Sequence, residues 1–233
     1  MCNRYKYEKA TLDDYLTDFS ALKIPLVFPN GVPNIEPRAD IRPTNRAWVF
    51  RPVDAADPTA GVEPVQIRWG LVPFFSKAID RRFLCTNARS ETVATTPSYR
   101  DPFKRRRCLI PADGYYEWTG ETPKGTRGAA NGKKTKWLFT RADGRPMMFP
   151  GLWDSATVPN AEGEPERLES FTMLTCAPGP DQANYHDRQP VILERADWGT
   201  WLDLGADVTG LLKGSAAGSV RVELAPPEVK GAT

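Results

Sequence analysis

Seven short apolar runs, separated by turn signals, constrain the fold of this chain more than any other feature of its sequence. Each run alternates or clusters apolar side chains over four to seven residues, which is typical of strands. The runs cover residues 47–51, 65–69, 108–111, 115–118, 136–140, 147–153 and 171–176. Turn-forming pairs such as Asp113-Gly114 and Asp143-Gly144 stand between them. Because helical patterns do not alternate with the runs, the sequence predicts an α+β fold and not a βαβ succession.

The clearest helical pattern begins near the N-terminus. Thr11 is a suitable N-cap, and Asp14 stands three positions later, as in a capping box. We expect this helix to continue to about Leu22 and to end before Pro25. One face of the helix carries apolar side chains that we expect to pack in the core: Leu12, Tyr15, Leu16 and Phe19.

Polar and proline-rich stretches predict the connections between these elements. Residues 25–46 contain five prolines and should be extended or looping. Residues 120–134 are rich in Gly, Lys and Thr and predict a mobile hairpin tip, and residues 159–169 predict a second polar excursion. Two short helical patterns follow, at residues 197–204 and 208–212.

Length and charge limit the organisation of the chain. With 233 residues, of which 40% are hydrophobic, it is most simply one domain over residues 1–225, followed by a flexible tail at residues 226–233. The formal net charge is only +2. Affinity for nucleic acid therefore has to come from local basic clusters, of which the clearest are residues 81–82 and 104–107.

Cysteine and histidine usage argues against a metal site. The four cysteines form no Cys-x-x-Cys pair, and the chain has one histidine, so we expect neither a metal nor a cofactor. No apolar leader or membrane-spanning run is present, which predicts a cytoplasmic protein. In that reducing compartment Cys85, Cys108 and Cys176 are interpreted as buried small hydrophobes. Nothing indicates an oligomer interface, so we expect a monomer.

Cys2 is the fourth cysteine, and its position gives it a distinct chemistry. Removal of Met1 leaves an α-amine with a pKa of about 8 beside a thiol with a pKa of about 8.5. Such an aminothiol condenses with an aldehyde: the amine forms an imine, and the thiolate then closes a thiazolidine ring. The alternative is that Cys2 occupies this position by chance and does nothing.

Three polar islands interrupt the strand pattern. Residues 85–92 are either a functional cluster or a strand leading into a helix capped by Ser90 or Thr92. Glu117 stands alone among aromatic residues, and is either an edge carboxylate facing water or a proton carrier with a raised pKa. His186 is the only histidine, and is either structural or the acid-base group of a site near neutral pH.

Five motifs that contain these residues resemble one known family. They stand in fixed order: Met-Cys-x-Arg-Tyr at residues 1–5, Trp-Gly-Leu-x-Pro at 69–73, Asn-Ala-Arg-Ser-Glu-Thr at 87–92, Pro-Ala-x-Gly-Tyr-Tyr-Glu-Trp at 111–118 and His-Asp-Arg-x-Pro at 186–190. Together they resemble the SRAP family, the SOS-response-associated peptidases that process abasic sites. The resemblance covers residues 1 to about 204. It implies a mostly antiparallel fold with a barrel-like or two-sheet core and short flanking helices.

The resemblance also implies a function and four catalytic residues. The expected activity is covalent capture of abasic sites in single-stranded DNA, after self-processing that removes Met1, with a weak strand-cleaving lyase activity. By this resemblance Cys2 is the nucleophile and Asn87 orients it and the sugar. Glu117 handles protons, and His186 assists opening of the sugar ring. A protein with this activity would associate with the nucleoid when bound to DNA.

The same resemblance implies a DNA-binding set, with some departures from the family pattern. The set is Arg4, Arg42, Trp69, Phe74, Phe75, Arg89 and Arg188. Guanidinium groups suit phosphates, and Phe74 and Phe75 either stack on bases or pack in the core. Phe75 stands where the family often has Trp, which weakens stacking. Asp40 stands where the family commonly has Asn, and its charge should repel phosphate unless Arg42 compensates.

The sequence is also compatible with two other functions. Cys2 and His186 could form the thiolate-imidazole pair of a cysteine peptidase that acts on other proteins. The chain could also be a non-covalent module for single-stranded DNA, with no chemistry at all. An intact Met1 would favour the second alternative, because a blocked amine cannot form an imine.

Overall fold

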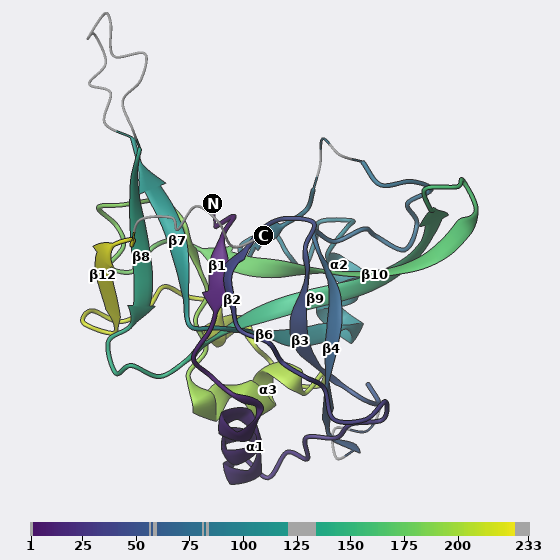
Figure 1. The fold of residues 1–233 in the computed structure, drawn as a ribbon, viewed down its shortest axis with the longest axis horizontal. Coiled ribbons are helices and arrows are strands. Elements are labelled where there is room, and N and C mark those ends of the chain that lie inside the picture. The colour runs from purple at the N-terminus through teal and green to yellow at the C-terminus, as the bar shows by residue number, and fades with distance from the viewer. Residues whose placement is uncertain are drawn as a thin grey trace, which may run out of the picture.

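The described part of the chain forms two β-sheets with helices around them (Figure 1). In this computed structural model the described residues are 2–55, 57, 60–80, 82, 84–120 and 134–226. The predicted mobile tip at residues 120–134 and the predicted tail at 226–233 lie almost wholly outside these ranges. None of the described helices combines the length and the apolar composition that a bilayer crossing requires.

The smaller sheet contains the strand that follows the N-terminus. Its strand order is β12-β8-β7-β1-β2, and each neighbouring pair is antiparallel. The five strands are β1 (Tyr5–Tyr7), β2 (Arg38–Ile41), β7 (Gly114–Thr119), β8 (Thr135–Arg141) and β12 (Val220–Leu224). Because β1 lies between β7 and β2, both of its edges are hydrogen-bonded, and this fixes the direction in which residues 2–4 leave the sheet.

The larger sheet is a barrel. Its order is β11-β10-β4-β3-β6-β9, and β9 also pairs with β10, which closes five of the strands into a ring. Strand β10 runs parallel to β4 and to β5, and the other pairs are antiparallel. The strands are β3 (Arg46–Pro52), β4 (Val62–Trp69), β5 (Asn87–Arg89), β6 (Arg107–Ala112), β9 (Met147–Pro159), β10 (Pro165–Cys176) and β11 (Gln189–Pro190). The predicted α+β class, with a mostly antiparallel and barrel-like core, is confirmed.

Aromatic side chains join the two sheets. Tyr5 of β1 meets Trp69 of β4 edge to face, with ring centroids 5.1 Å apart. Trp69 in turn stacks on Phe171 of β10 at 6.4 Å, and Tyr5 also meets Phe149 of β9. All four rings are fully or almost fully buried. This contact ties the N-terminal strand to the wall of the barrel.

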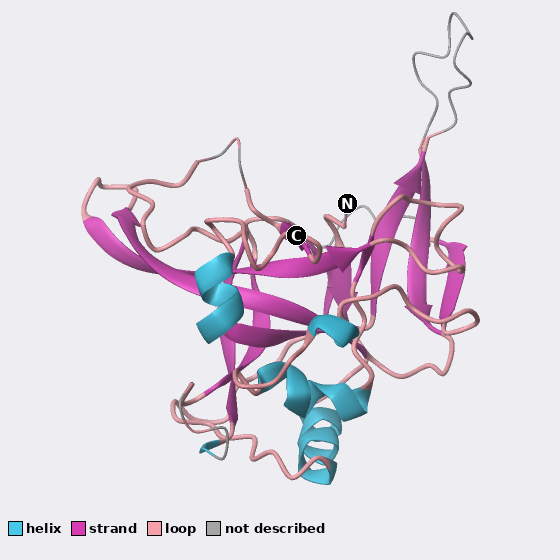
Figure 2. Cartoon of the chain, turned by 180° about the vertical axis from the view of Figure 1, so that it is seen from behind, coloured by secondary structure: helices cyan, strands magenta, loops and turns pink. Residues whose placement is uncertain are grey.

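The helices lie outside the strands, as Figure 2 shows. Helix α1 (Leu12–Ala21) has the predicted capping box between Thr11 and Asp14, and it buries Tyr15 and Phe19. The predicted helical patterns near the C-terminus are confirmed as short helices: η2 (Arg195–Asp197), α3 (Trp198–Leu202) and η3 (Thr209–Leu211). Helix α2 (Arg100–Arg105) was not predicted as such. It begins after a series of turns, and neither Ser90 nor Thr92 caps it.

Several connections are more ordered than the sequence predicts. Strand β2 lies inside residues 25–46, for which the prolines predicted an extended or looping segment and no defined strand. The polar excursion expected at residues 159–169 is limited to the turn between β9 and β10, because β10 already begins at Pro165. Of the three cysteines expected to be buried, Cys108 and Cys176 are, whereas Cys85 is half-buried. Pairing of β2 with β1 and of β10 with β9 supplies the hydrogen bonds that these short or polar segments cannot supply alone.

Candidate functional site

Cys2 lies buried beside the strand that carries it into the fold. Its side chain is 1% exposed, and its sulfur donates to the carbonyl of Arg4 at 3.6 Å. The carbonyl of Arg4 also accepts from the backbone N–H of Tyr116 on β7, at 2.9 Å. The register Tyr5 to Tyr115 therefore places residue 2 next to the far end of β7, where Glu117 stands.

Asn87 holds the backbone of Cys2. It lies on β5, which runs parallel to β10 with Asn87 opposite Met173. Its Nδ2 donates to the carbonyl oxygen of Cys2 at 2.8 Å and to Oγ1 of Thr86 at 3.0 Å. Its Oδ1 is buried and has no hydrogen-bond partner among the described residues. Asn87 thus fixes the position of Cys2, and its Oδ1 is available to accept a hydrogen bond from a substrate.

Glu117 is a buried carboxylate next to the thiol. It is 4% exposed, so the interpretation of Glu117 as an edge residue facing water is wrong. Burial raises the pKa of Glu117, while nearby His186 acts in the opposite direction. Burial, reinforced by the charge of Glu117, also raises the pKa of the Cys2 thiol far above its usual range. The site therefore keeps the thiol protonated and places a proton acceptor beside it.

His186 completes the group and lies beside Glu117. Its Nε2 lies 4.0 Å from Oε2 of Glu117. Its Nδ1 accepts from the backbone N–H of Arg188 at 2.9 Å, and the Asp187 carboxylate lies at the same distance. The structure thus brings together all four predicted catalytic residues: Cys2 with Asn87, Cys2 with Glu117, and Glu117 with His186.

Two of the predicted DNA-binding arginines share one carboxylate. Asp40 accepts two 2.7 Å hydrogen bonds from Arg4, and Arg42 binds the same carboxylate at 2.6–2.7 Å. Although partial burial opposes it, hydrogen bonding from both arginines lowers the pKa of Asp40 to about 2. The expected repulsion of phosphate by Asp40 is therefore offset, because the cluster of Arg4, Asp40 and Arg42 carries one net positive charge.

The other predicted arginines differ in their exposure. Arg89 on β5 is exposed. Arg188 binds Glu91 through both terminal nitrogens, at 2.6 and 2.9 Å, and donates to the carbonyl of Thr175. Its side chain is only 14% exposed, so it anchors the turn after His186 more than it faces solvent.

The predicted basic cluster at residues 104–107 is not a continuous basic surface. Arg107 is buried, with its guanidinium over the rings of Phe103 and Trp201. Arg106 forms ion pairs with Asp101 and Asp154. In the other cluster, Arg82 pairs with Asp80, and residue 81 lies outside the described ranges.

The aromatic part of the DNA-binding set divides into core and surface. Trp69 does not face DNA: it is fully buried, and its indole N–H donates to the carbonyl of Thr86 at 2.9 Å. Phe74 and Phe75 are 58% and 53% exposed, so core packing does not explain them. They meet edge to face at 5.4 Å, and the N–H of Phe74 is held by the buried carboxylate of Asp154 at 2.9 Å.

Sequence reasoning assigned no role to several residues that support the site. Glu91 lies in the motif at residues 87–92 and Trp118 in the motif at 111–118, and this placement was the sequence signal that could have identified them. Trp118 lies 5.6 Å from the guanidinium of Arg4 and 5.7 Å from the ammonium of Lys136. Asp154 had no local signal beyond being an acid within an apolar strand. Within the described ranges, no three His, Cys, Asp or Glu side chains are grouped so as to hold a metal ion.

Comparison with known proteins places this geometry in a family. The chain is 30% identical over 203 residues to abasic site processing protein YoaM of Bacillus subtilis, covering 87% of this chain and 79% of the relative. It is 32% identical over 171 residues to an abasic site processing protein of Saccharomyces cerevisiae, and 36% identical over 138 residues to YoqW of Bacillus subtilis. Those two matches cover 71% and 59% of this chain but only 40% and 56% of the relatives' lengths.

Solved structures and a family model give the same result. A crystal structure of a protein from Bordetella bronchiseptica superposes with a TM-score of 0.70 at 26% identity, covering 97% of this chain and all of that one. A protein from Bacteroides thetaiotaomicron has the same fold, with a TM-score of 0.71, 20% identity and coverage of 96% of this chain and 91% of that one. A sequence model described as "SOS response associated peptidase (SRAP)" matches residues 1–226. The chain therefore belongs to the SRAP family.

Proposed function

We propose that this protein captures abasic sites in single-stranded DNA by forming a thiazolidine between Cys2 and the opened sugar. Relatives named abasic site processing proteins support the substrate class. The grouping of Cys2, Asn87, Glu117 and His186 supports the chemistry.

The proposed reaction has two stages, which are removal of Met1 and capture of the aldehyde by imine formation and ring closure. Hydrolysis of the Met1–Cys2 peptide bond consumes one water and exposes the α-amine. The amine then attacks the C1′ aldehyde of the ring-opened abasic sugar and releases one water as the imine forms. Finally the Cys2 sulfur adds to the imine carbon, its proton leaves for a neighbouring base, and the imine nitrogen gains a proton. The product is a five-membered ring that joins protein to DNA.

Each remaining residue has a role that its environment supports. Glu117, whose pKa is raised, accepts the thiol proton and returns it to nitrogen. His186 supplies the proton that opens the sugar ring and supports a weak lyase reaction. The Oδ1 atom of Asn87 accepts a hydrogen bond from the freed α-amine or from a sugar hydroxyl.

One observation carries this proposal: the side-chain amide of Asn87 binds the backbone carbonyl of Cys2 at 2.8 Å. A cysteine in this position by chance requires no distant residue to fix its backbone. Here Asn87, which is 85 positions away, does so. The buried carboxylate of Glu117 lies nearby, where an apolar side chain would be expected. Positioning of this kind is what condensation with a bound aldehyde requires.

The proposed path for the DNA strand follows the exposed members of the predicted set. Arg4 and Arg42 offer one net positive charge through their shared Asp40, and Arg89 stands exposed next to Asn87 on β5. Phe74 and Phe75 present rings on which bases can stack. Trp69 has no part in this path, because it is buried.

The experiment is capture of an oligonucleotide that carries one abasic site. We expect a conjugate that survives denaturation with the wild type and none with Cys2→Ala, and an intact mass lower by one methionine. If the mature protein keeps Met1, or if Cys2→Ala conjugates as well as the wild type, the proposal is wrong. The raised pKa of the Cys2 thiol disfavours the thiolate-imidazole pair of a peptidase that acts on other proteins. The proposed capture needs no preformed thiolate, because it begins at the α-amine and passes the thiol proton to Glu117 during ring closure.

A further inference from the structure

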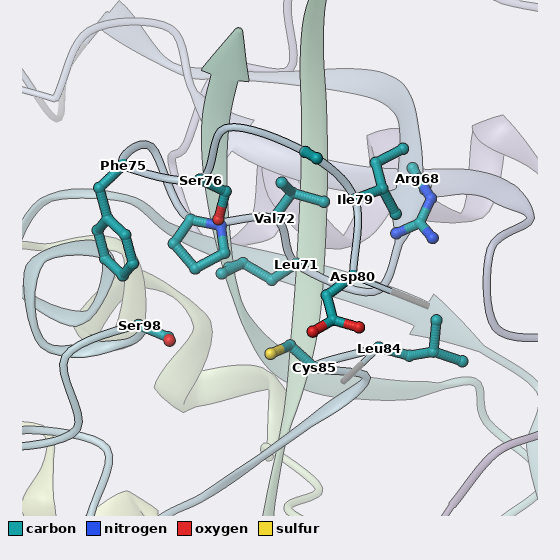
Figure 3. A pocket seen from close by; sticks show the side chains of 12 residues that line it. Arg68, Leu71, Val72, Phe75, Ser76, Ile79, Asp80, Leu84, Cys85 and Ser98 are labelled. Atoms are coloured by element: carbon teal, nitrogen blue, oxygen red, sulfur yellow. The ribbon is translucent and has the colours of Figure 1, made fainter. Parts of the chain in front are cut away.

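A pocket of about 160 Å³ opens beside the exposed Phe75 (Figure 3). Its apolar lining includes the buried Leu71 and Val72 and the half-buried Leu84. Its rim carries the Phe75 ring together with polar groups, among them the Asp80 carboxylate and the Ser98 hydroxyl. The half-buried thiol of Cys85 also faces it, and the reaction proposed above uses none of these pocket groups except the Phe75 ring.

The pocket adjoins the catalytic group through the chain itself. The carbonyl of Cys85 accepts from the N–H of Leu71 at 3.2 Å, which fixes the pocket wall. Cys85 precedes Asn87 by two residues, a span of at most about 7 Å of chain. Asn87 is the residue that holds Cys2. Because Cys85 lines the pocket and Asn87 holds Cys2, we place the base next to a captured sugar within reach of this pocket.

The size and lining of the pocket fit one aromatic ring. An apolar cavity of about 150 Å³ is large enough to bind benzene. Phe75 at the rim adds a face on which a planar ring can stack. The adjacent loop is fixed, because the N–H groups of Val72 and Phe74 donate to Ser170 at 2.7 Å and to Asp154 at 2.9 Å. The pocket is thus held open by the barrel wall.

The polar rim suits the edge of a nucleobase. Asp80 binds the backbone and side chain of Arg82, and these hydrogen bonds lower the pKa of its carboxyl, so Asp80 is an ionised acceptor near neutral pH. Arg82 balances its charge, which lets a DNA strand approach. A carboxylate accepts from an exocyclic amine such as that of cytosine, and serine hydroxyls both donate and accept.

We propose that this pocket binds one unstacked pyrimidine base adjacent to the abasic site. The inference rests on the proposed function, because it assumes that a single strand lies across Cys2. It adds a recognition site: capture depends on the presence of a base next to the missing one. An isolated abasic sugar without such a neighbour is a poorer substrate.

The test compares capture of two kinds of oligonucleotide at subsaturating protein. One has cytosine beside the abasic site, and the other has a non-reactive tetrahydrofuran spacer there, with each side of the abasic site tested separately. We expect the wild type to capture the cytosine-flanked site five- to tenfold faster on one side. In Ser98→Phe, which fills the pocket, that rate should fall to the spacer rate. The matched control Ser20→Phe, on exposed helix α1, should behave as the wild type.

The outcomes separate this inference from the proposed function. No conjugate with any oligonucleotide overturns the proposed function. Conjugates formed at equal rates with cytosine and spacer overturn the pocket alone, and so does a preference for cytosine that survives in Ser98→Phe. The spacer rate of Ser98→Phe also reports whether that variant folds.

A second measurement needs no capture and no pocket variant. In Cys2→Ala, Cys85 is the most accessible cysteine, because Cys108 and Cys176 are buried. We expect a cytosine-containing strand to slow alkylation of Cys85 by iodoacetamide at least fivefold. An all-spacer strand of equal length should leave the alkylation rate unchanged. Equal protection by both strands, or by neither, overturns the inference.

Discussion

The backbone N–H of Arg188 donates a 2.9 Å hydrogen bond to Nδ1 of His186. A backbone N–H can only donate, so in the neutral imidazole Nδ1 is the acceptor and the proton is on Nε2. Nε2 is the nitrogen that faces Glu117 at 4.0 Å. The Asp187 carboxylate also lies 2.9 Å from Nδ1, but it is 88% exposed and competes weakly in water. The turn thus directs the proton of His186 into the site.

The first prediction concerns this tautomer. Because His186 is the only histidine, ¹⁵N NMR reports its two ring nitrogens without ambiguity, and the neutral form should show a protonated Nε2. Glu91→Ala removes the partner that anchors Arg188, and should give a mixture of tautomers and a three- to tenfold slower lyase reaction. Glu162→Ala, in the exposed turn after β9, is the control. A pure Nε2–H signal in Glu91→Ala would contradict the anchoring role.

The second prediction concerns Asn87. Asn87→Ala loses the hydrogen bond to the Cys2 carbonyl, so the aminothiol is no longer held for attack. We expect capture of an abasic oligonucleotide to slow about 10- to 100-fold, with folding retained. Asn34→Ala, which loses only a contact with Glu36 in an exposed loop, should leave the rate unchanged. Equal rates in the two variants would show that the bond does not position Cys2 for reaction.

The third prediction concerns the stability cost of Glu117. A free Glu titrates near pH 4.3, and burial raises the pKa of Glu117 in the fold. In the window above pH 4.3 the folded state binds more protons than the unfolded state, so stability falls as pH rises through it. Glu117→Gln removes this penalty. Thermal unfolding should show a higher Tm than the wild type at pH 7–8, and no difference at pH 4. A difference independent of pH would rule out ionisation as its cause.

The fourth prediction concerns Asp40. Its pKa of about 2 keeps the carboxylate ionised down to about pH 4, and its ion pairs weaken only as pH falls from there toward 2. Asp40→Asn releases Arg42 to contact phosphate. In fluorescence anisotropy with intact single-stranded DNA, the slope of log K against log salt should steepen by about 0.7.

The same variant should capture abasic sites more slowly, because Arg4 loses its two-point contact with Asp40. Asp13→Asn makes the same charge change on α1, away from the site, and should alter neither quantity. An unchanged salt slope in Asp40→Asn would mean that Arg42 does not reach the DNA.

The fifth prediction concerns Asp154, whose side chain is 3% exposed. It accepts from the N–H groups of Phe74 and Ser155 and pairs with Arg106. Asp154→Ala leaves these partly buried donors without their acceptor, which should lower the free energy of unfolding by about 3 kcal/mol. For a chain of this size the Tm should fall by about 6–12 °C. Asp13→Ala, on the exposed face of α1, should change it by about 1–2 °C, and an equal effect in both variants would contradict this role.

The sequence predicted those features whose cause is local. The capping box of α1 depends on residues three positions apart, and the barrel strands depend on their own alternation of apolar side chains. Strand β2 escaped prediction, because a run of four residues among prolines becomes a strand only when β1 supplies its hydrogen bonds. Glu117 could be identified as a candidate, but the sequence left open whether it faced water or the site.

The sequence by itself determined the fold class and the choice of candidate site residues, because the spacing of apolar side chains, the turn residues and the order of the motifs can be read along the chain. Only the tertiary structure decided which side chains are reachable and how they are charged. In the folded chain Trp69 is buried, Phe74 and Phe75 are exposed, and Arg188 forms an ion pair with Glu91. Burial and ion pairing depend on residues brought together from distant strands, so no local pattern contains them.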